Sequence, residues 1–124
     1  MARLHGIDEA PEHRAAGVWL RHHPDAWRSG GGPAAAVMSR KPWVAYYAAA
    51  PYAELPEGGL AETSARMQST STRVLVIDAR WAAPQRPALA PLLDRASHRA
   101  ALIFSTDRPH ALRLYRVPPL ELVP

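Results

Sequence analysis

The chain has 124 residues, a formal net charge of +4 and no cysteine. This length suits one domain with a buried core, and the lack of cysteine excludes disulfide bonds and thiolate metal sites. Basic and acidic residues are interleaved and form no run, so we expect no nucleic-acid partner. Because no apolar stretch reaches transmembrane length, we expect the chain as given to be soluble.

Residues 1–10 have no clear period and are expected to form an entry arm. A helix is predicted from about Ala10 to His23, because apolar positions recur at helical spacing and Pro11 suits a first turn. These positions are Ala15, Ala16, Trp19, Leu20 and His23. The glycine-rich stretch at 29–33 lacks both phosphate-binding fingerprints, which favours a plain surface loop.

The middle of the chain predicts alternating strands and helices. We expect a strand at 34–39, a short helix at 43–50, a strand at 53–55 and a helix at 60–71. The short helix carries three aromatic residues, which are expected to pack onto the sheet or else to lie on a membrane interface or a partner domain. They are Trp43, Tyr46 and Tyr47.

The stretch at 73–78 predicts the central strand. Its β-branched apolar run is typical of a strand that is covered on both faces, as in a parallel sheet, and it ends in a carboxylate at Asp78. Pro87 suits the start of a further helix, which is expected to bury leucine side chains as far as about residue 95.

The last two predicted strands lie at 100–105 and 112–117. Apolar and basic residues alternate in the second, which indicates an exposed or edge strand with one wet face. The linker between them is too short for a parallel crossover, so we expect an antiparallel hairpin. Prolines in the tail at 118–124 cannot extend the sheet.

This order of elements predicts a single α/β domain at residues 11–117. The expected fold is a small three-layer, Rossmann-like sandwich with four or five mostly parallel strands and a C-terminal antiparallel hairpin. Right-handed crossovers would place helices on both faces of the sheet.

Several segments together are similar to a known family. They are AGVWLR at 16–21, VMSRKPWVAYYA at 37–48, RVLVID at 73–78, RPALAPLL at 86–93 and LRLYRV at 112–117. Their order and spacing resemble the C-terminal soluble region of bacterial integral-membrane glycosyltransferases of the dolichyl-phosphate-mannose–protein mannosyltransferase-like group. The resemblance covers roughly residues 12–117, and no single segment is diagnostic.

The resemblance implies an α/β module on the extracytoplasmic face of a bacterial membrane, within a larger protein. In that family a membrane core transfers a sugar from a polyprenyl-phosphate donor. Nothing in this chain corresponds to the core, so no catalytic residue is carried over and no cofactor is expected. The implied partners are the membrane-embedded part of the same protein and a sugar or polyprenyl-phosphate ligand.

A candidate ligand site lies where the strands end, because open α/β sheets bind ligands beyond the carboxyl ends of their strands. The expected residues are Arg40, Lys41, Asp78, Arg80 and Trp81. The cations could bind a sugar phosphate or lipid phosphate, and the indole could stack on a sugar. The alternative is structural: Asp78 pairs with Arg80 or Arg40 to order a loop, and Trp81 caps the core.

The six histidines predict no metal site, and we expect them to be solvated. Two are adjacent and point in different directions on a helix, and the others are scattered. The adjacent pair is His22 and His23, and the others are His5, His13, His98 and His110. The chain also lacks a serine nucleophile elbow, and its acidic residues suit helix starts and loops better than acid–base catalysis.

Three functions stay open on this basis. The first is a non-catalytic accessory domain of a membrane glycosyltransferase-like protein. The second is a stand-alone α/β protein that binds an anionic small molecule such as a sugar phosphate. The third, an enzyme acting alone, is the weakest because no catalytic constellation is visible. A homodimer that pairs through the expected edge strand at 112–117 is a further expectation.

Overall fold

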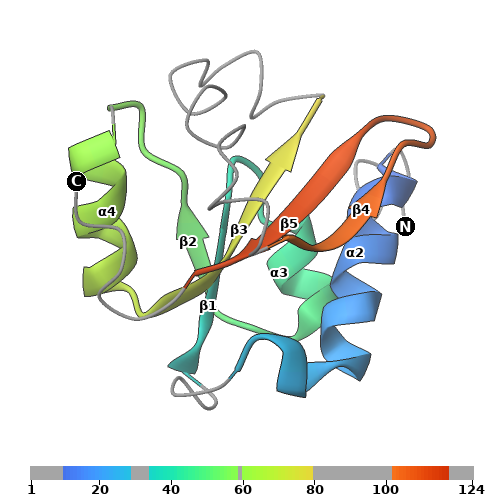
Figure 1. Cartoon of the computed structure of the whole chain (residues 1–124), viewed down its shortest axis with the longest axis horizontal. Coiled ribbons are helices and arrows are strands. Elements are labelled where there is room, and N and C mark those ends of the chain that lie inside the picture. Colours follow the sequence, from blue (N-terminus) through green and yellow to red (C-terminus); the bar gives the residue numbers. More distant parts are fainter. Residues whose placement is uncertain (1–9, 29–33, 59, 80–101, 118–124) are drawn as a thin grey trace, which may run out of the picture.

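A computed structural model describes residues 10–28, 34–58, 60–79 and 102–117. Helices and strands alternate along it and end in a hairpin (Figure 1). The helices are α2 (Pro11–His22), a 3-10 turn η2 (Pro24–Ala26), α3 (Trp43–Ala48) and α4 (Leu60–Ser69). The strands are β1 (Ala36–Ser39), β2 (Tyr52–Glu54), β3 (Thr72–Asp78), β4 (Leu102–Thr106) and β5 (Leu112–Arg116).

The five strands form one mixed sheet in the order β2-β1-β3-β5-β4. Strands β2, β1 and β3 are parallel, whereas β5 runs antiparallel to both β3 and β4. The expected small α/β fold, its central strand β3 and its C-terminal hairpin are therefore confirmed.

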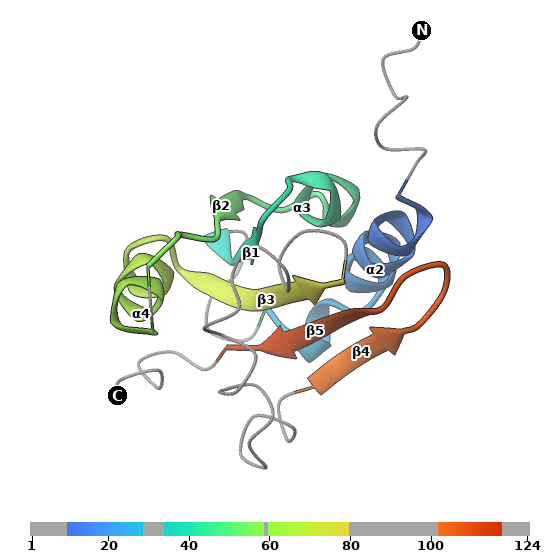
Figure 2. The ribbon, with the colours of Figure 1, turned by 90° about the horizontal axis from the view of Figure 1, so that it is seen from above.

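Helices cover both faces of the sheet, with α2 and α3 on one side and α4 on the other (Figure 2). The connection through α3 leads outward from β1 to β2, and the connection through α4 leads back across β1 to β3. Crossovers of one hand place helices on opposite faces when the direction reverses in this way. Two apolar cores result, one on each face of the sheet.

The larger core lies between the sheet and the helices α2 and α3. Alternate residues of the strands supply it, among them Val74 and Val76 of β3 and Leu112 and Leu114 of β5. Trp27, which the sequence did not single out, is 1% exposed in this core, and its indole Nε1 donates to the Leu20 carbonyl at 2.9 Å. This hydrogen bond ties the chain after α2 back onto the end of the helix.

The prediction that residues 112–117 form an edge strand is wrong. Strand β5 lies between β3 and β4, and the edges of the sheet are β4 and β2. The alternation in β5 arises because Leu112 and Leu114 enter the larger core while Arg113 and Tyr115 point to the other face, where both are half-buried. The alternation therefore indicated which side chains of β5 enter the larger core, and it did not indicate the place of the strand in the sheet.

The packing prediction for Tyr46 is also wrong, since its side chain is 62% exposed. Helix α3 has only six residues and buries Val44, Ala45 and Ala48. These positions follow the i, i+1, i+4 spacing of one helical face, and Tyr46 lies on the opposite face. Its ring meets that of Tyr47 edge to face, with centroids 5.1 Å apart.

Other expectations fall outside the described residues. These are the glycine-rich loop at 29–33, the helix from Pro87 to about residue 95, the tail at 118–124 and the entry arm up to residue 9.

Helices α2 and α3 cross at Gly17, which is buried. A Cβ atom there would lie 2.5 Å from the Tyr47 Cβ and 2.7 Å from the Val44 carbonyl oxygen. Both atoms belong to α3 and cannot turn aside. Glycine at this position therefore sets how closely the two helices approach, although glycine inside a helix carries an entropic cost.

We predict that Gly17→Ala lowers the free energy of unfolding by about 1–3 kcal/mol, because overpacking at the crossing outweighs the gain in helix propensity. Urea denaturation measures the change. The exposed Arg21 on the same helix provides a control, since Arg21→Ala should stay within about 0.5 kcal/mol of the wild type. A Gly17→Ala protein more stable than the wild type would contradict the close crossing.

Candidate functional site

Strands β1 and β3 are parallel neighbours, β3 continues beyond the end of β1, and each strand ends in a polar residue. Ser39 ends β1 and Asp78 ends β3. Strand alternation puts Asp78 on the same face as Val74 and Val76, which is the face that α2 and α3 cover. The chain leaves β1 toward β2 on one side of the sheet, and it leaves β3 toward β4 and β5 on the other side. Open α/β sheets bind ligands at such a point, which here lies between β1 and β3.

A buried His–Asp contact joins the first turn of α2 to the end of β3. The His13 Nε2 atom lies 3.1 Å from the Asp78 Oδ2 atom, and each side chain is 1% exposed. Because a carboxylate oxygen can only accept, the imidazole Nε2–H donates. The His13 ring also meets the Trp43 ring edge to face, with centroids 5.7 Å apart. Helices α2 and α3 and the strand β3 thus converge on one imidazole.

The prediction of a solvated His13 is wrong. The buried residues of α2 are Glu12, His13, Ala16, Gly17 and Leu20. The set from His13 onward follows the i, i+3, i+4, i+7 spacing of one helical face. The predicted positions Ala16 and Leu20 belong to this buried face, whereas Ala15 and His23 are exposed and His13 was not among the predicted positions. The helical spacing, continued from Leu20 toward the start of the helix, reaches His13. This spacing was the signal in the sequence that could have predicted the site.

The end of β1 is held by a second set of contacts, toward β2. The Arg40 Nη1 lies 3.7 Å from the Glu54 Oε2, and the Ser39 hydroxyl donates to the Lys41 carbonyl. The Tyr52 hydroxyl lies 3.2 Å from the Ser39 carbonyl and 3.3 Å from the Arg40 carbonyl. Burial raises the pKa of the Tyr52 phenol, and the nearby Glu54 carboxylate raises it further, so the phenol remains a donor to these carbonyls.

The structure places three of the five predicted ligand residues at one edge of the sheet. Asp78 lies beneath α2 and is 2% exposed, whereas the Arg40 side chain is 28% exposed and faces Glu54. The structural alternative for Asp78 named Arg40 or Arg80 as its partner, and the hydrogen bond found here comes from His13. Arg80 and Trp81 lie outside the described residues. Ligand binding by this set stays a prediction.

Chemically, the buried pair is an oriented imidazole whose Nε2 is fixed by a carboxylate. Such a pair can hold a helix on a strand, and with a substrate at the other ring nitrogen it could also move a proton. In the part of the chain described here, His, Cys, Asp and Glu side chains do not gather in groups of three or more that could hold a metal ion. None of the described helices combines the length and apolar character needed to cross a bilayer.

Comparisons with models of protein families, with curated proteins and with solved structures found no match to this chain.

A double-mutant cycle tests the contact between α2 and β3. His13→Ala and Asp78→Ala should each lower the free energy of unfolding by about 1–3 kcal/mol, because each removes the buried partner of the other group. The double variant should cost less than the sum of the two, by about 0.5–3 kcal/mol.

The exposed pair Arg40–Glu54 is the matched control for this cycle. Its coupling energy should be only about 0–1 kcal/mol, as for other solvated ion pairs. Strictly additive effects at His13 and Asp78 would show that the two side chains do not interact in solution.

Proposed function

We propose that this chain is the non-catalytic, Rossmann-like soluble module of a membrane glycosyltransferase-like protein. Sugar transfer from a polyprenyl-phosphate donor would be performed by a membrane-embedded core elsewhere in that protein. The module would lie on the extracytoplasmic face and shape the acceptor side of the active site.

The observation that carries this proposal is that the polar side chains at the carboxyl ends of β1 and β3 are occupied in contacts within the protein. In ligand-binding α/β domains this edge presents its polar side chains to the crevice. Here the side chains of Asp78 and His13 are both 1% exposed and bond to each other, and the Ser39 hydroxyl donates to the Lys41 carbonyl. Groups that are buried in mutual contacts support a scaffold better than a reaction centre.

Four of the five resembling segments support the same proposal, because they coincide with helices and strands of the fold, and the fifth, at 86–93, lies outside the described residues. The segment at 16–21 lies in α2, the segment at 37–48 covers most of β1 and all of α3, and 73–78 forms nearly all of β3. The segment at 112–117 contains β5. The chain leaves β1 toward β2 on one side of the sheet and leaves β3 toward β4 and β5 on the other side, and this change of side, with helices on both faces, supports the Rossmann-like description.

A second candidate function is the binding of an anionic small molecule such as a sugar phosphate. Its support is the position of Arg40 and Lys41 just beyond the end of β1, where both side chains are partly accessible. A guanidinium and an ammonium at this place could bind phosphate oxygens.

The size and location of the native gene product separate the two candidates. An antibody raised against the 124-residue chain would be used on fractionated cells of the organism that encodes it. We expect a product much larger than 13.6 kDa in the membrane fraction, with the epitope open to protease added outside the cytoplasmic membrane. A cytoplasmic marker controls for lysis.

A product of 13.6 kDa in the soluble fraction would contradict the accessory-domain proposal and favour the second candidate.

A further inference from the structure

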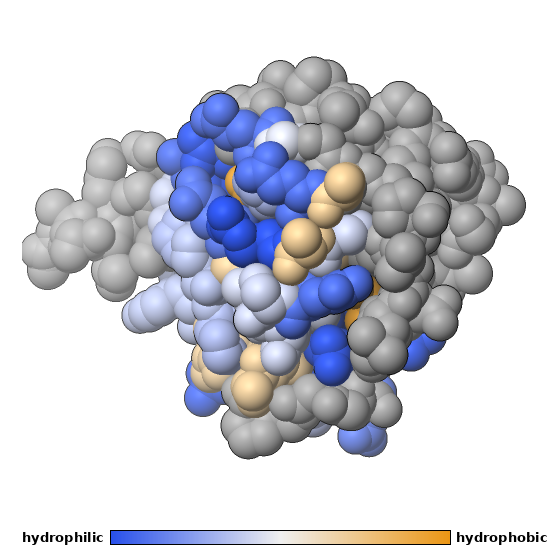
Figure 3. All heavy atoms as spheres, turned by 90° about the vertical axis from the view of Figure 1, so that its left-hand side faces the viewer, coloured by the Kyte–Doolittle hydropathy of each residue, from blue (hydrophilic) through white to orange (hydrophobic). Residues whose placement is uncertain are grey.

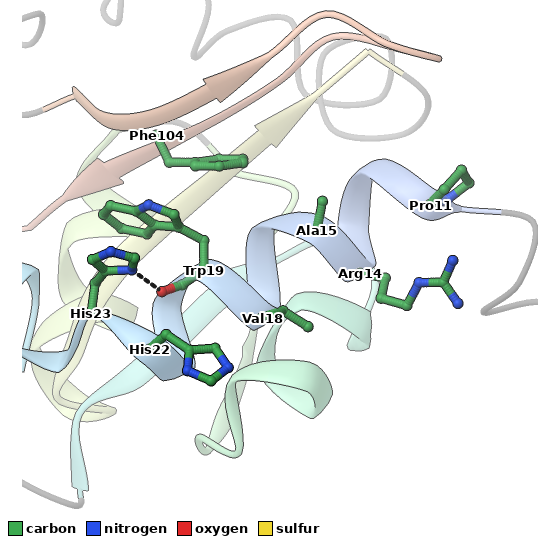
Figure 4. Close-up of a pocket in the computed structure, with 8 residues that line it drawn as sticks. All are labelled: Pro11, Arg14, Ala15, Val18, Trp19, His22, His23 and Phe104. Atoms are coloured by element: carbon green, nitrogen blue, oxygen red, sulfur yellow. Dashed lines mark hydrogen bonds between the residues drawn. The ribbon is translucent and has the colours of Figure 1, made fainter.

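An apolar groove, which we call the α2 groove, lies on the surface between α2 and β4 (Figure 4). Ala15, Val18 and Trp19 of α2 line one side of it. Phe104 of β4 lines the other side and projects toward Trp19. Val18 is 40% exposed, and Trp19 and Phe104 are half-buried. A ligand in the groove would therefore contact two aromatic rings and an exposed aliphatic side chain.

The aromatic side chains of the groove hold one another in place. The ring centroids of Phe104 and Trp19 are 5.5 Å apart, and the Trp19 ring stacks on the His23 ring at 4.3 Å. The His23 Nδ1 donates to the Trp19 carbonyl at 2.8 Å, which fixes this imidazole. Side chains that are already ordered lose little freedom when a partner binds, and this favours binding.

The titratable side chains that line the groove are all basic. Arg14 lies toward the start of α2, His22 lies in its last turn, and none of the described lining residues is acidic. Glu12 is the one acidic residue in the sequence of α2, and it is only 1% exposed. A partner in the groove therefore meets N–H donors and positive charge at the rim of an apolar surface.

Exposed aromatic side chains elsewhere have a different setting. Tyr52 is 40% exposed, but Arg40 and Glu54 beside it carry opposite charges. Its hydroxyl is also engaged with two backbone carbonyls. Tyr46 is 62% exposed and lies on α3, which has no charged residue. Apolar side chains and groups of a single charge sign thus occur together at the α2 groove and not beside these two tyrosines.

We infer that the α2 groove binds a short segment of a partner protein that combines apolar side chains with carboxylates. Its apolar side chains would lie against Trp19 and Phe104. One carboxylate would accept hydrogen bonds from the Arg14 guanidinium, and a second would accept from the His22 imidazole. Charge complementarity of this kind selects an acidic partner over a basic one. The inference does not depend on the proposed function.

The length of α2 sets the spacing of the acidic groups. Arg14 and His22 are about 12 Å apart along the helix axis, at 1.5 Å per residue. An extended chain advances about 3.3 Å per residue, so acidic residues about four positions apart reach both groups. The residues between them would cover Val18. Because Trp19 and Phe104 are half-buried between α2 and β4, a peptide chain reaches their rings more closely than a flat bilayer surface does.

Synthetic peptides test the inference on the full 124-residue chain. The probes are labelled peptides with two glutamates four positions apart and leucine or phenylalanine between them, and a matched set with lysine in place of both glutamates. Fluorescence anisotropy should show binding of glutamate peptides, with the matched lysine peptides at least about fivefold weaker, the change that one solvated ion pair produces. Nuclear magnetic resonance shifts caused by the glutamate peptides should centre on Val18, Trp19 and Phe104.

Two charge reversals separate the groove from the net charge of the chain. Arg14→Glu should weaken binding of the glutamate peptide at least about fivefold and should strengthen binding of the lysine peptide. Arg66→Glu is the matched control, because it changes the net charge equally at an exposed position of α4. Figure 3 faces this end of the molecule, where the described residues are mostly hydrophilic. The control should bind both peptides within about twofold of the wild type, because distant charges are screened.

Unchanged circular dichroism would show that both variants keep the fold. The inference is overturned if no glutamate peptide shifts the signals of the groove, or if the glutamate and lysine peptides bind equally well. It is also overturned if Arg66→Glu weakens binding as much as Arg14→Glu does. Shifts of the same signals with phosphatidylglycerol vesicles, and none with glutamate peptides, would overturn it in favour of a lipid surface.

Discussion

The hydrogen bond between His13 and Asp78 fixes how the helical layer sits on the sheet. It joins the first turn of α2 to the last residue of the central strand, and both side chains are almost fully buried. Burying an imidazole or a carboxylate without a hydrogen-bond partner destabilises the folded state. The folded state is therefore stable only when His13 and Asp78 lie close enough to bond to each other. Because one end of α2 is held in this way, the helix can slide along the sheet only if this contact breaks.

The rest of the larger core follows from that constraint. With α2 held at its N-terminus, Gly17 meets α3 and Leu20 enters the core. At the other end, the Trp27 indole bonds to the Leu20 carbonyl and holds the chain after the helix. The outward-facing side of α2, with Val18 and Trp19, is thereby placed beside β4. One side of α2 therefore packs into the larger core, and the other side lines the apolar groove beside β4.

Much of the fold could be predicted from local patterns. The apolar run at 74–77 is too short for a helix and too apolar for an exposed strand, which identified β3 as the centre of the sheet. The short linker before Leu112 allowed only a hairpin. Neither pattern carries information about which strand lies outermost, and for that reason the edge was assigned to β5 when it belongs to β4.

The candidate site was harder to predict, because its contact joins residues that are 65 positions apart. Asp78 was identified from its place at the end of a strand, whereas its partner was not, since a histidine near a helix start is usually solvated. The burial of His13 depends on α2 lying across β3, and no local pattern encodes that. The prediction for Tyr46 was wrong for a different reason. Aromatic residues are often buried in cores, but in this six-residue helix the small residues Ala45 and Ala48 are buried instead.

The protonation and exchange of the His13 ring test the central claim most directly. Nuclear magnetic resonance of the chain with nitrogen-15 in its histidines distinguishes the two ring nitrogens of each imidazole. A buried donor to Asp78 predicts that Nε2 of His13 carries a proton that exchanges slowly with water, unlike those of the exposed His22 and His23. A His13 ring whose protons exchange as fast as theirs, with both tautomers populated, would contradict the account.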